Sequence, residues 1–323
     1  MGQIEDKYIS LLTDYGFKRI FGTTMNKDLL ISFLNSLFDG EQVIVDVKYL
    51  NSEHVGDIMT ERKAIFDVYC ENEKGEKFIV EMQNAFQEFF KDRSIFYSTY
   101  PIREQAKKGN EWDFHLNHVY TIAMLNFRMN DPAFKPGEII HKVQLCDVAT
   151  NKVFYHKLDY IYIELANVHK TEDELETMFD KWMFVLKNLG RLEQRPKALQ
   201  ERIFTKLFKE AEIAAFDPIA IREYEDSIKA YRDIKNSLDT AMRQGIEKGM
   251  KQGIEKGMRQ GIEKGRAEGR AEGRAEGRAE GEAMGAKKEK YEIARKMQAM
   301  SLPIEAIMQA TGLSREEILN FTE

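Results

Sequence analysis

The sequence is poor in cysteine and contains no long hydrophobic run, and both absences exclude classes of protein. Its 323 residues include two cysteines, Cys70 and Cys146, which are too few and too isolated for a disulfide framework or a zinc site. We expect both to be small buried side chains. No run of about 18 apolar residues occurs, so the sequence predicts neither a membrane span nor a membrane partner.

A signal peptide and an excess of positive charge are also missing. The first residues, MGQIEDKYIS, are charged from the start, unlike a signal peptide, and we therefore expect a cytoplasmic protein. The formal net charge is −6, whereas proteins that bind nucleic acid non-specifically are usually basic. This charge argues against a large DNA-binding surface but leaves room for a local basic cleft.

Common catalytic motifs are absent as well. The six histidines are scattered, and no pair has the spacing of metal ligands. No glycine-rich loop follows a strand in the βαβ pattern of a nucleotide-binding fold. The sequence therefore offers no serine, cysteine or histidine site, and attention turns to its carboxylates.

Composition divides the chain into three regions, which are residues 1–240, 241–288 and 289–323. In the first region, helical and strand-like patterns alternate, which predicts an α/β domain with a mixed sheet flanked by helices. A turn at Asp39-Gly40 is expected to end the first helix, and Pro101 to bend or interrupt a later one. The patterns predict helices over 27–38, about 85–109 and within 171–231, and strands over 43–50, 64–70, 77–83, 119–127, 139–148 and 160–165.

The second region is a repeat in which glycine recurs every fourth residue from Gly245 to Gly285. In a helix, a row at this spacing drifts by about 40° per repeat. Each interior glycine costs about 1 kcal/mol relative to alanine, so the repeat is either a flexible tether or a helix that a partner holds, for instance in a homo-oligomer. Its charges indicate a solvated face, with DNA contact as the alternative.

The last region has the pattern of a small helical tail. It predicts a helix over 291–300, a second helix from Pro303 to the break at Thr311-Gly312, and a third that begins with the capping box Ser314–Glu317. Three short helices with a glycine-containing turn resemble a helix-turn-helix. The third helix, however, carries two glutamates in its capping box, where they would oppose phosphate. A small oligomerisation or packing cap is therefore favoured.

One hairpin places carboxylates inside apolar strands. It reads FDVYCENEKGEKFIVEMQ over residues 66–83, and a three-residue turn at 73–75 would put Asp67 directly opposite Glu81. Their Cβ atoms would then lie about 5 Å apart. Two such carboxylates repel unless a cation lies between them, and a hard divalent ion is the natural candidate. The alternative is that both acids simply face solvent.

Strict alternation along the hairpin makes two further predictions. Gln83 would share the face of Glu81, where it could orient a water molecule on the ion. Phe66 would lie with Val68 and Cys70 on the other face of the first strand.

Several segments together resemble a known family. Asp67, a gap of thirteen residues and then Glu81-Met82-Gln83 resemble the PD-(D/E)XK nuclease pattern, with glutamine in place of the usual lysine. The segment LTDYGFKRIF (12–21) resembles the opening motif of the Rpn family of recombination-promoting nucleases, which are also called transposases. A charged glycine repeat before a helical tail is typical of that family. The resemblance covers most of residues 8–190, and its other segments are 80–83, 91–94 with Tyr97, 105–109, 119–127 and 163–165.

The resemblance implies a restriction-endonuclease-like core and a DNA endonuclease that depends on Mg²⁺ or Mn²⁺. Such an enzyme would hydrolyse phosphodiesters and promote recombination or act with mobile elements. The implied site consists of the metal ligands Asp67 and Glu81, Gln83 at the lysine position, Asp14 as a further acid, and Lys18 and Arg93 at phosphate. Asp14 could instead be a helix cap or turn residue, Lys18 and Arg93 could be surface cations, and Tyr97 is expected in the core.

The glutamine at position 83 leaves the proton acceptor open. Gln83 carries no charge and cannot act as a general base. A second metal-bound water or a lysine from elsewhere, such as Lys18, could take the proton instead. The competing hypothesis is a catalytically weak DNA-binding or oligomeric assembly protein that retains the nuclease fold.

Overall fold

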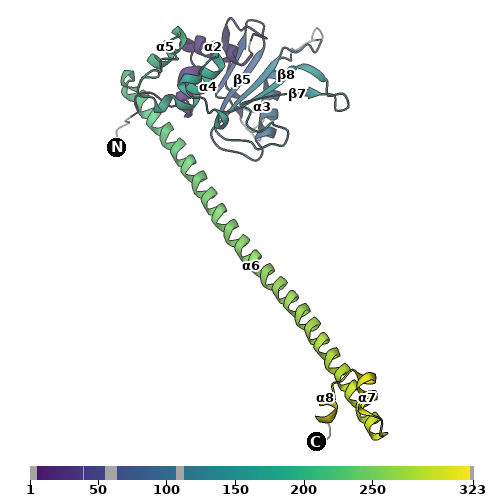
Figure 1. Cartoon of the computed structure of the whole chain (residues 1–323). Coiled ribbons are helices and arrows are strands. Elements are labelled where there is room, and N and C mark those ends of the chain that lie inside the picture. Colours follow the sequence, from purple (N-terminus) through teal and green to yellow (C-terminus); the bar gives the residue numbers. More distant parts are fainter. Residues whose placement is uncertain (1–5, 39, 55–63, 107–112, 321–323) are drawn as a thin grey trace. The chain divides into compact units, whose positions relative to one another are not determined.

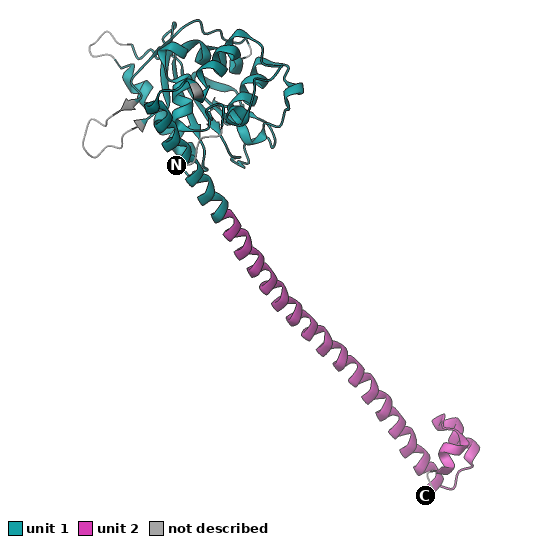
Figure 2. Cartoon of the chain, turned by 90° about the vertical axis from the view of Figure 1, so that its left-hand side faces the viewer, with its two compact units in different colours: residues 1–240 teal, residues 241–323 magenta. Residues whose placement is uncertain are grey.

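A mixed sheet forms the centre of the first of two compact units. The structure, a computed structural model, describes residues 6–38, 40–54, 64–106 and 113–320. The chain divides into units of residues 1–240 and 241–323 (Figure 2). Within the described residues, the sheet of the first unit has six strands, in the spatial order β1 (Val47–Tyr49), β4 (Val68–Asn72), β5 (Lys77–Gln83), β6 (Val119–Leu125), β8 (Val153–Glu164) and β7 (Ile140–Cys146).

The centre of this sheet is parallel and its margins are antiparallel. Strands β5, β6 and β8 run parallel, whereas β1, β4 and β7 are antiparallel to their neighbours. Strands β2 (Glu53–His54) and β3 (Ala64–Ile65) pair separately. The mixed sheet that the sequence predicts is thereby confirmed.

Helices cover both faces of the sheet (Figure 1). One face packs against α2 (Lys27–Phe38) and α4 (Met178–Asn188), where Trp182 contacts the rings of Phe21 and Phe33. The other face packs against α3 (Phe90–Glu104) through Phe90, Ala123 and Tyr162. The first unit also contains α1 (Asp14–Phe21), α5 (Arg202–Glu210) and the 3₁₀ helices Thr24–Asn26, Leu165–Asn167, Glu172–Glu174, Leu189–Arg191 and Ile213–Ala215.

The β4–β5 hairpin has the predicted register. Val68 pairs with Val80, and a three-residue turn closes with the Gly75 amide donating to the Asn72 carbonyl at 3.0 Å. Gly75 has φ of +77°, a conformation that glycine adopts without steric cost. Asp67 lies one residue before the paired region, so its expected place opposite Glu81 falls just outside the ladder.

The first strand of the hairpin is nevertheless interrupted. Strand β3 ends at Ile65 and β4 begins at Val68, with a bend at Asp67 between them. The bend breaks the alternation, so Phe66 packs with Tyr69 and Ile79 rather than with Val68. The prediction that Phe66 shares a face with Val68 and Cys70 was therefore wrong.

Other local predictions differ from the structure in instructive ways. Helix α1 lies in a segment that the sequence marked only as a motif. Strand β1 is much shorter than the predicted 43–50, because Val43 and Val45 are exposed. Pro101 lies inside α3 without interrupting it. Cys70 is buried as expected, whereas Cys146 is exposed. Asp39 and residues 107–109 lie outside the described residues.

The second unit consists of helices. Helix α6 (Pro218–Ala299) includes the entire glycine repeat, so of the two alternatives the structure has the helical one. A small core of Ala294, Ile307, Leu313 and Ile318 joins its end to α7 (Ile304–Thr311) and α8 (Arg315–Leu319).

The two short helices have the predicted end signals. Gly312, with φ of +69°, ends α7, and the reciprocal bonds of Ser314 and Glu317 begin α8. No helix among the described residues is both long enough and apolar enough to cross a membrane.

Candidate active site

Polar and charged side chains from four parts of the first unit meet beside the β4–β5 hairpin. Helix α1 supplies two of them, the bend before β4 supplies one, β5 supplies two, and α3 supplies one. The residues proposed from the sequence are all present in this group, which consists of Asp14, Lys18, Asp67, Glu81, Gln83 and Arg93.

Helix α1 orients its acid and its lysine. Thr13 is the N-cap, and its hydroxyl accepts a hydrogen bond from the Gly16 amide at 3.1 Å. Asp14 is therefore the first helical residue rather than the cap. One turn later, the Lys18 ammonium lies 2.7 Å from an Asp14 carboxylate oxygen and 3.7 Å from Oδ1 of Asp67. Lys18 thus lies between two acids and is not an isolated surface cation.

The backbone of β5 fixes the Asp67 carboxylate. Its Oδ2 accepts a hydrogen bond from the Met82 amide at 2.8 Å. Asp67 lies at the bend just outside the paired residues of β4 and β5, and this hydrogen bond attaches its side chain to β5. Its side chain is 17% exposed.

Glu81 is a carboxylate inside the protein. The residue is only 5% exposed, because it lies on the face of β5 that α3 covers. Its Oε2 lies 3.4 Å from an Arg93 guanidinium nitrogen, whereas its buried Oε1 has no hydrogen-bond partner among the described residues. A buried, incompletely paired carboxylate is expensive, and such a group requires a specific explanation.

The electrostatics show that this site concentrates negative charge. Burial, and next the charge of Asp67, raise the pKa of Glu81 to about 8, although Arg93 and Lys18 act in the opposite direction. Burial also raises the pKa of Asp67, with a further contribution from Asp14. Partial burial alone would lower the pKa of Lys18, but its bond to Asp14 and the charges of Asp14, Asp67 and Glu81 raise it overall.

Arg93 connects the acids to α3. It donates to Oε1 of Gln87 at 3.1 Å and to Oε1 of Gln83 at 3.5 Å. Its guanidinium also lies 4.9 Å from the Tyr97 ring centre, and that ring packs on Phe66. Tyr97 therefore joins the core to the site, whereas the sequence placed it in the core alone.

Gln83 is held by its own loop. Its amide nitrogen donates to the Ala85 carbonyl at 3.0 Å, while its oxygen faces Arg93. The side chain therefore has fixed partners at the position where the nuclease pattern has lysine.

The donor set fits a hard divalent ion. Asp67 and Glu81 present carboxylate oxygens: Oδ1 of Asp67 lies 3.7 Å from the Lys18 ammonium, and Oε1 of Glu81 has no hydrogen-bond partner among the described residues. Mg²⁺ typically binds one or two carboxylates and keeps water or substrate phosphate at its other positions. The described residues contain no group of three or more acidic, histidine or cysteine side chains placed to hold a metal.

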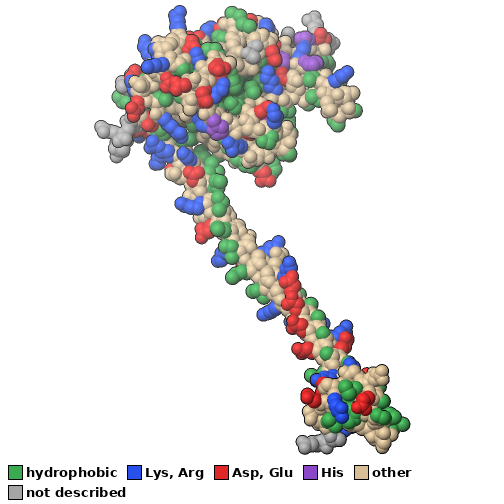
Figure 3. All heavy atoms as spheres, viewed as in Figure 1, with side chains coloured by type: hydrophobic (Ala, Val, Ile, Leu, Met, Phe, Trp, Pro, Cys, Tyr) green, Lys and Arg blue, Asp and Glu red, His purple; other side chains and the backbone are tan. Residues whose placement is uncertain are grey.

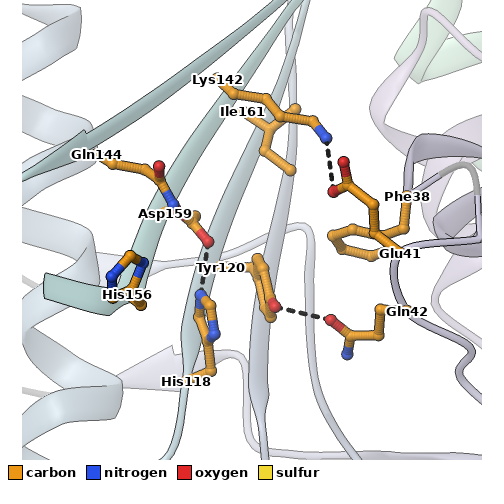
Figure 4. Close-up of a pocket in the computed structure, with 10 residues that line it drawn as sticks. All are labelled: Phe38, Glu41, Gln42, His118, Tyr120, Lys142, Gln144, His156, Asp159 and Ile161. Carbon is orange, nitrogen blue, oxygen red and sulfur yellow. Dashed lines mark hydrogen bonds and ion pairs between the residues drawn. The ribbon is translucent and has the colours of Figure 1, made fainter. Parts of the chain in front are cut away.

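A second polar pocket, which the sequence did not predict, opens on the opposite face of the sheet (Figure 4). Its volume is about 370 Å³, and it contains His118 and His156, which are far apart in the sequence. His118 Nε2 lies 2.6 Å from Oδ2 of Asp159, and the His118 ring stacks on Tyr120 at 3.8 Å. The sequence gives the alternation along β6 and β8 but not the register between them, so it could not show that His118 and Asp159 lie together.

Comparison with known proteins gives one result. Neither a curated protein nor a solved structure matches the chain significantly. The sequence model described as PD-(D/E)XK nuclease family transposase matches residues 11–241, a range that includes every candidate residue. Since this match spans more than half of the sequence, the chain belongs to the family of PD-(D/E)XK nuclease family transposases.

Proposed function

We propose that the chain is a DNA endonuclease that depends on a divalent metal and acts in recombination or with mobile elements. Membership of the family supports a nuclease with DNA as its substrate, and PD-(D/E)XK nucleases generally use divalent metals. One observation carries the proposal for this chain. Asp67 and Glu81 are adjacent carboxylates in a largely buried position, both have raised pKa values, and Oε1 of Glu81 has no partner among the described residues.

Asp67 and Glu81 are the residues that would hold Mg²⁺ or Mn²⁺. An ion at this position would polarise the phosphodiester and lower the pKa of an attacking water. Both carboxylates are held in place by neighbouring groups. The Met82 amide orients Asp67, and the Arg93 guanidinium orients Glu81. Asp14 adds negative charge beside Asp67, which helps to raise the pKa of Asp67, and its ion pair positions Lys18.

Lys18 and Arg93 are suited to binding phosphate. The raised pKa of Lys18 keeps it a cation at neutral pH, so it is a poor proton acceptor. The planar guanidinium of Arg93 matches phosphate geometry. With Gln83 unable to take a proton, neither Lys18 nor Gln83 serves as the general base at neutral pH.

A second candidate function is supported by Gln83 itself. The residue replaces the lysine of the motif, and its amide group is already engaged by Ala85 and Arg93. A protein of this kind could bind DNA and assemble on it with little catalysis. This candidate predicts DNA binding without a metal-dependent product.

Cleavage of supercoiled plasmid distinguishes the two candidates. Purified protein would be assayed with Mg²⁺, Mn²⁺, Ca²⁺ or a chelator, beside Glu81→Gln and the matched variant Glu71→Gln. Glu71 lies on the adjacent strand and pairs with Lys77 and Lys48, away from the site. We expect nicking with Mg²⁺ or Mn²⁺ by the wild type and by Glu71→Gln, but not by Glu81→Gln.

The same experiment can contradict either candidate. Equal cleavage by the wild type and Glu81→Gln would overturn the proposed site. No cleavage by any protein, together with DNA binding measured by fluorescence anisotropy, would support the assembly protein instead.

A further inference from the structure

The long helix α6 displays side chains that soluble proteins normally cover. Every residue from 232 to 290 is exposed. From residue 234 to residue 262, an isoleucine, leucine or methionine occurs at every fourth position, and Figure 3 shows hydrophobic side chains along the outside of the helix. These residues, which are 41–68% exposed, are Ile234, Leu238, Met242, Ile246, Met250, Ile254, Met258 and Ile262.

A single copy of the chain does little to stabilise this helix. A Cβ atom added at any glycine from Gly245 to Gly285 would meet nothing within 4 Å. The eleven glycines of the repeat together cost roughly 11 kcal/mol relative to alanine. Among the described residues of the repeat, the one ion pair joins Lys264 and Glu268 at 3.8 Å, and an exposed pair of this kind offsets little of the cost. The energetics therefore favour a partner that covers the helix.

The second half of the repeat is organised in four rows. Measured around the helix from the glycine row, an arginine row lies at about +100°, an alanine row at about 200° and a glutamate row at about −60°. The glycine row thus runs between arginines on one side and glutamates on the other. The arginine row is Arg266, Arg270, Arg274 and Arg278, and the glutamate row is Glu268, Glu272, Glu276 and Glu280.

This pattern is unfavourable within one helix. Side chains four residues apart are neighbours, and within each of these rows the neighbours carry the same charge. The arginine and glutamate rows are about 160° apart, so they are too far around the helix to pair with each other. The charges are complementary only between two helices.

We propose that the repeat pairs with the repeat of a second copy of this chain, parallel and in register, through the glycine rows. In a parallel pair, the +100° row of each helix faces the −60° row of its partner. Every arginine then lies near partner glutamates on both sides of the contact. In an antiparallel pair, arginines would face arginines and glutamates would face glutamates, which is repulsive.

The first half of the repeat is compatible with the same pairing. There the row at +100° is apolar rather than basic, as at Ile246 and Met250. In a parallel pair, these side chains can pack against the partner's glycines, which have no Cβ atom to block the contact. Glycine and apolar rows side by side are typical of closely packed helix pairs.

The spacing also determines the hand of the winding. A period of four residues exceeds the 3.6 of the helix, so the rows wind right-handedly and complete a turn in about 54 Å. The segment from Gly245 to Gly285 is about 60 Å long, or slightly more than one such turn. Two copies that stay on their glycine rows therefore wrap around each other once.

Disulfide cross-linking of the full chain tests the orientation. In a Cys146→Ser background, Gly245→Cys and Gly285→Cys would each be oxidised under mild conditions and analysed without reductant. Parallel, in-register copies bring identical positions together, so both variants should form covalent dimers. The matched control Ala267→Cys, in the alanine row opposite the contact, should remain monomeric on the same gel. Cross-linking at Gly265→Cys but at neither end would show an antiparallel pair and overturn the proposal.

Charge reversal gives an independent test. One variant changes the four arginines to glutamate, and the other changes the four glutamates to arginine. Each alone should sediment as a monomer, and an equimolar mixture should regain the wild-type mass. Circular dichroism would verify that each variant remains helical. A monomeric wild type, or two variants that each keep the wild-type mass, would overturn the proposal.

Discussion

The two units of the chain break the usual rule of burial in opposite directions. In residues 1–240, an acidic side chain, Glu81, lies inside the protein. In residues 241–323, apolar side chains such as Met250 and Met258 lie in the solvent. Isolated exposed apolar residues are common, whereas a regular row of them, or a buried acid with one oxygen that has no partner among the described residues, calls for an explanation. The two proposals supply one each, an ion for the first unit and a second copy for the other.

The two units also differ in the size of the hydrophobic core that stabilises them. The first unit has an extensive core, with Phe17, Phe33 and Trp182 fully buried, and this core can absorb the cost of a buried charge. In the described part of the second unit, the buried apolar side chains form one small cluster around Ile307 and Ile318 at the end of α6. Loss of its partner should therefore affect the second unit's structure more than loss of the ion affects the first.

The largest expected effect is on catalysis. Asp67→Asn should lower metal-dependent cleavage at least about 100-fold, because the change removes a charged oxygen donor. The matched change Asp46→Asn, at an exposed acid paired with Lys27, should have no effect. Plasmid nicking with Mn²⁺ measures both. Full activity of Asp67→Asn would show that the buried acids of the first unit serve another purpose.

Arg93 should have a smaller but clear role. Arg93→Ala removes the partner of Glu81 and a candidate phosphate contact, so we expect cleavage to fall about 10–100-fold. Arg93→Lys keeps the charge but loses the planar fork, and it should recover only part of the activity. Single-turnover rates at saturating DNA, beside DNA affinities in Ca²⁺, separate the two contributions. Unchanged rates and affinities for both variants would assign Arg93 to the fold alone.

The pKa of Glu81 predicts an unusual pH dependence of stability. A carboxyl whose folded pKa is raised to about 8 keeps its proton in the folded state longer than in the unfolded state. Its contribution is favourable below about pH 4.5 and is lost progressively as the pH rises towards 8, at about 1.4 kcal/mol per unit. Without metal, the melting temperature should therefore fall over this range in the wild type more steeply than in Glu81→Gln.

Divalent metal should reverse that trend. Mn²⁺ binds the ionised acids, so it should raise the melting temperature more at pH 8 than at pH 6. Differential scanning fluorimetry with and without Mn²⁺ measures the effect, with Glu81→Gln as the control that should respond little. A metal-induced shift that is independent of pH would contradict the assignment.

The smallest effect concerns single glycines of the repeat. In a self-sufficient helix, Gly269→Ala would only stabilise, by about 1 kcal/mol. If a second copy lies against the glycine row, the added methyl group should also weaken association, whereas Ala271→Gly, in the opposite row, should leave the contact itself unchanged. Sedimentation at several concentrations gives both dissociation constants. Tighter association of Gly269→Ala would indicate that the glycine row is not the contact.

Patterns within short segments made most of the fold predictable. Helix α2 follows its apolar spacing, and β5 matches its predicted bounds, because both bury a regular face. The turn at Gly75 fixed the hairpin register, and that register predicted that Asp67 and Glu81 would lie close enough for their charges to interact. Helix α1 was not predicted as a helix, because its eight residues are too few to show a clear period.

Features that depend on contacts distant in the sequence could not be predicted. The burial of Glu81 depends on α3, and the bend at Asp67 depends on the Met82 amide, so neither could be read from the local pattern. The partners of Lys18 likewise come from separate segments. The roles of all six site residues remain proposals that the experiments above can test.

The four-residue period of the repeat has a consequence for inheritance. Tandem coding repeats gain and lose units readily when DNA is copied. Inserting or deleting four residues in α6 would leave every row in phase, whereas a change of one, two or three residues would bring an arginine, alanine or glutamate into the glycine row. If the glycine rows pair as proposed, the length of this segment can therefore change in whole four-residue units without loss of the pairing surface.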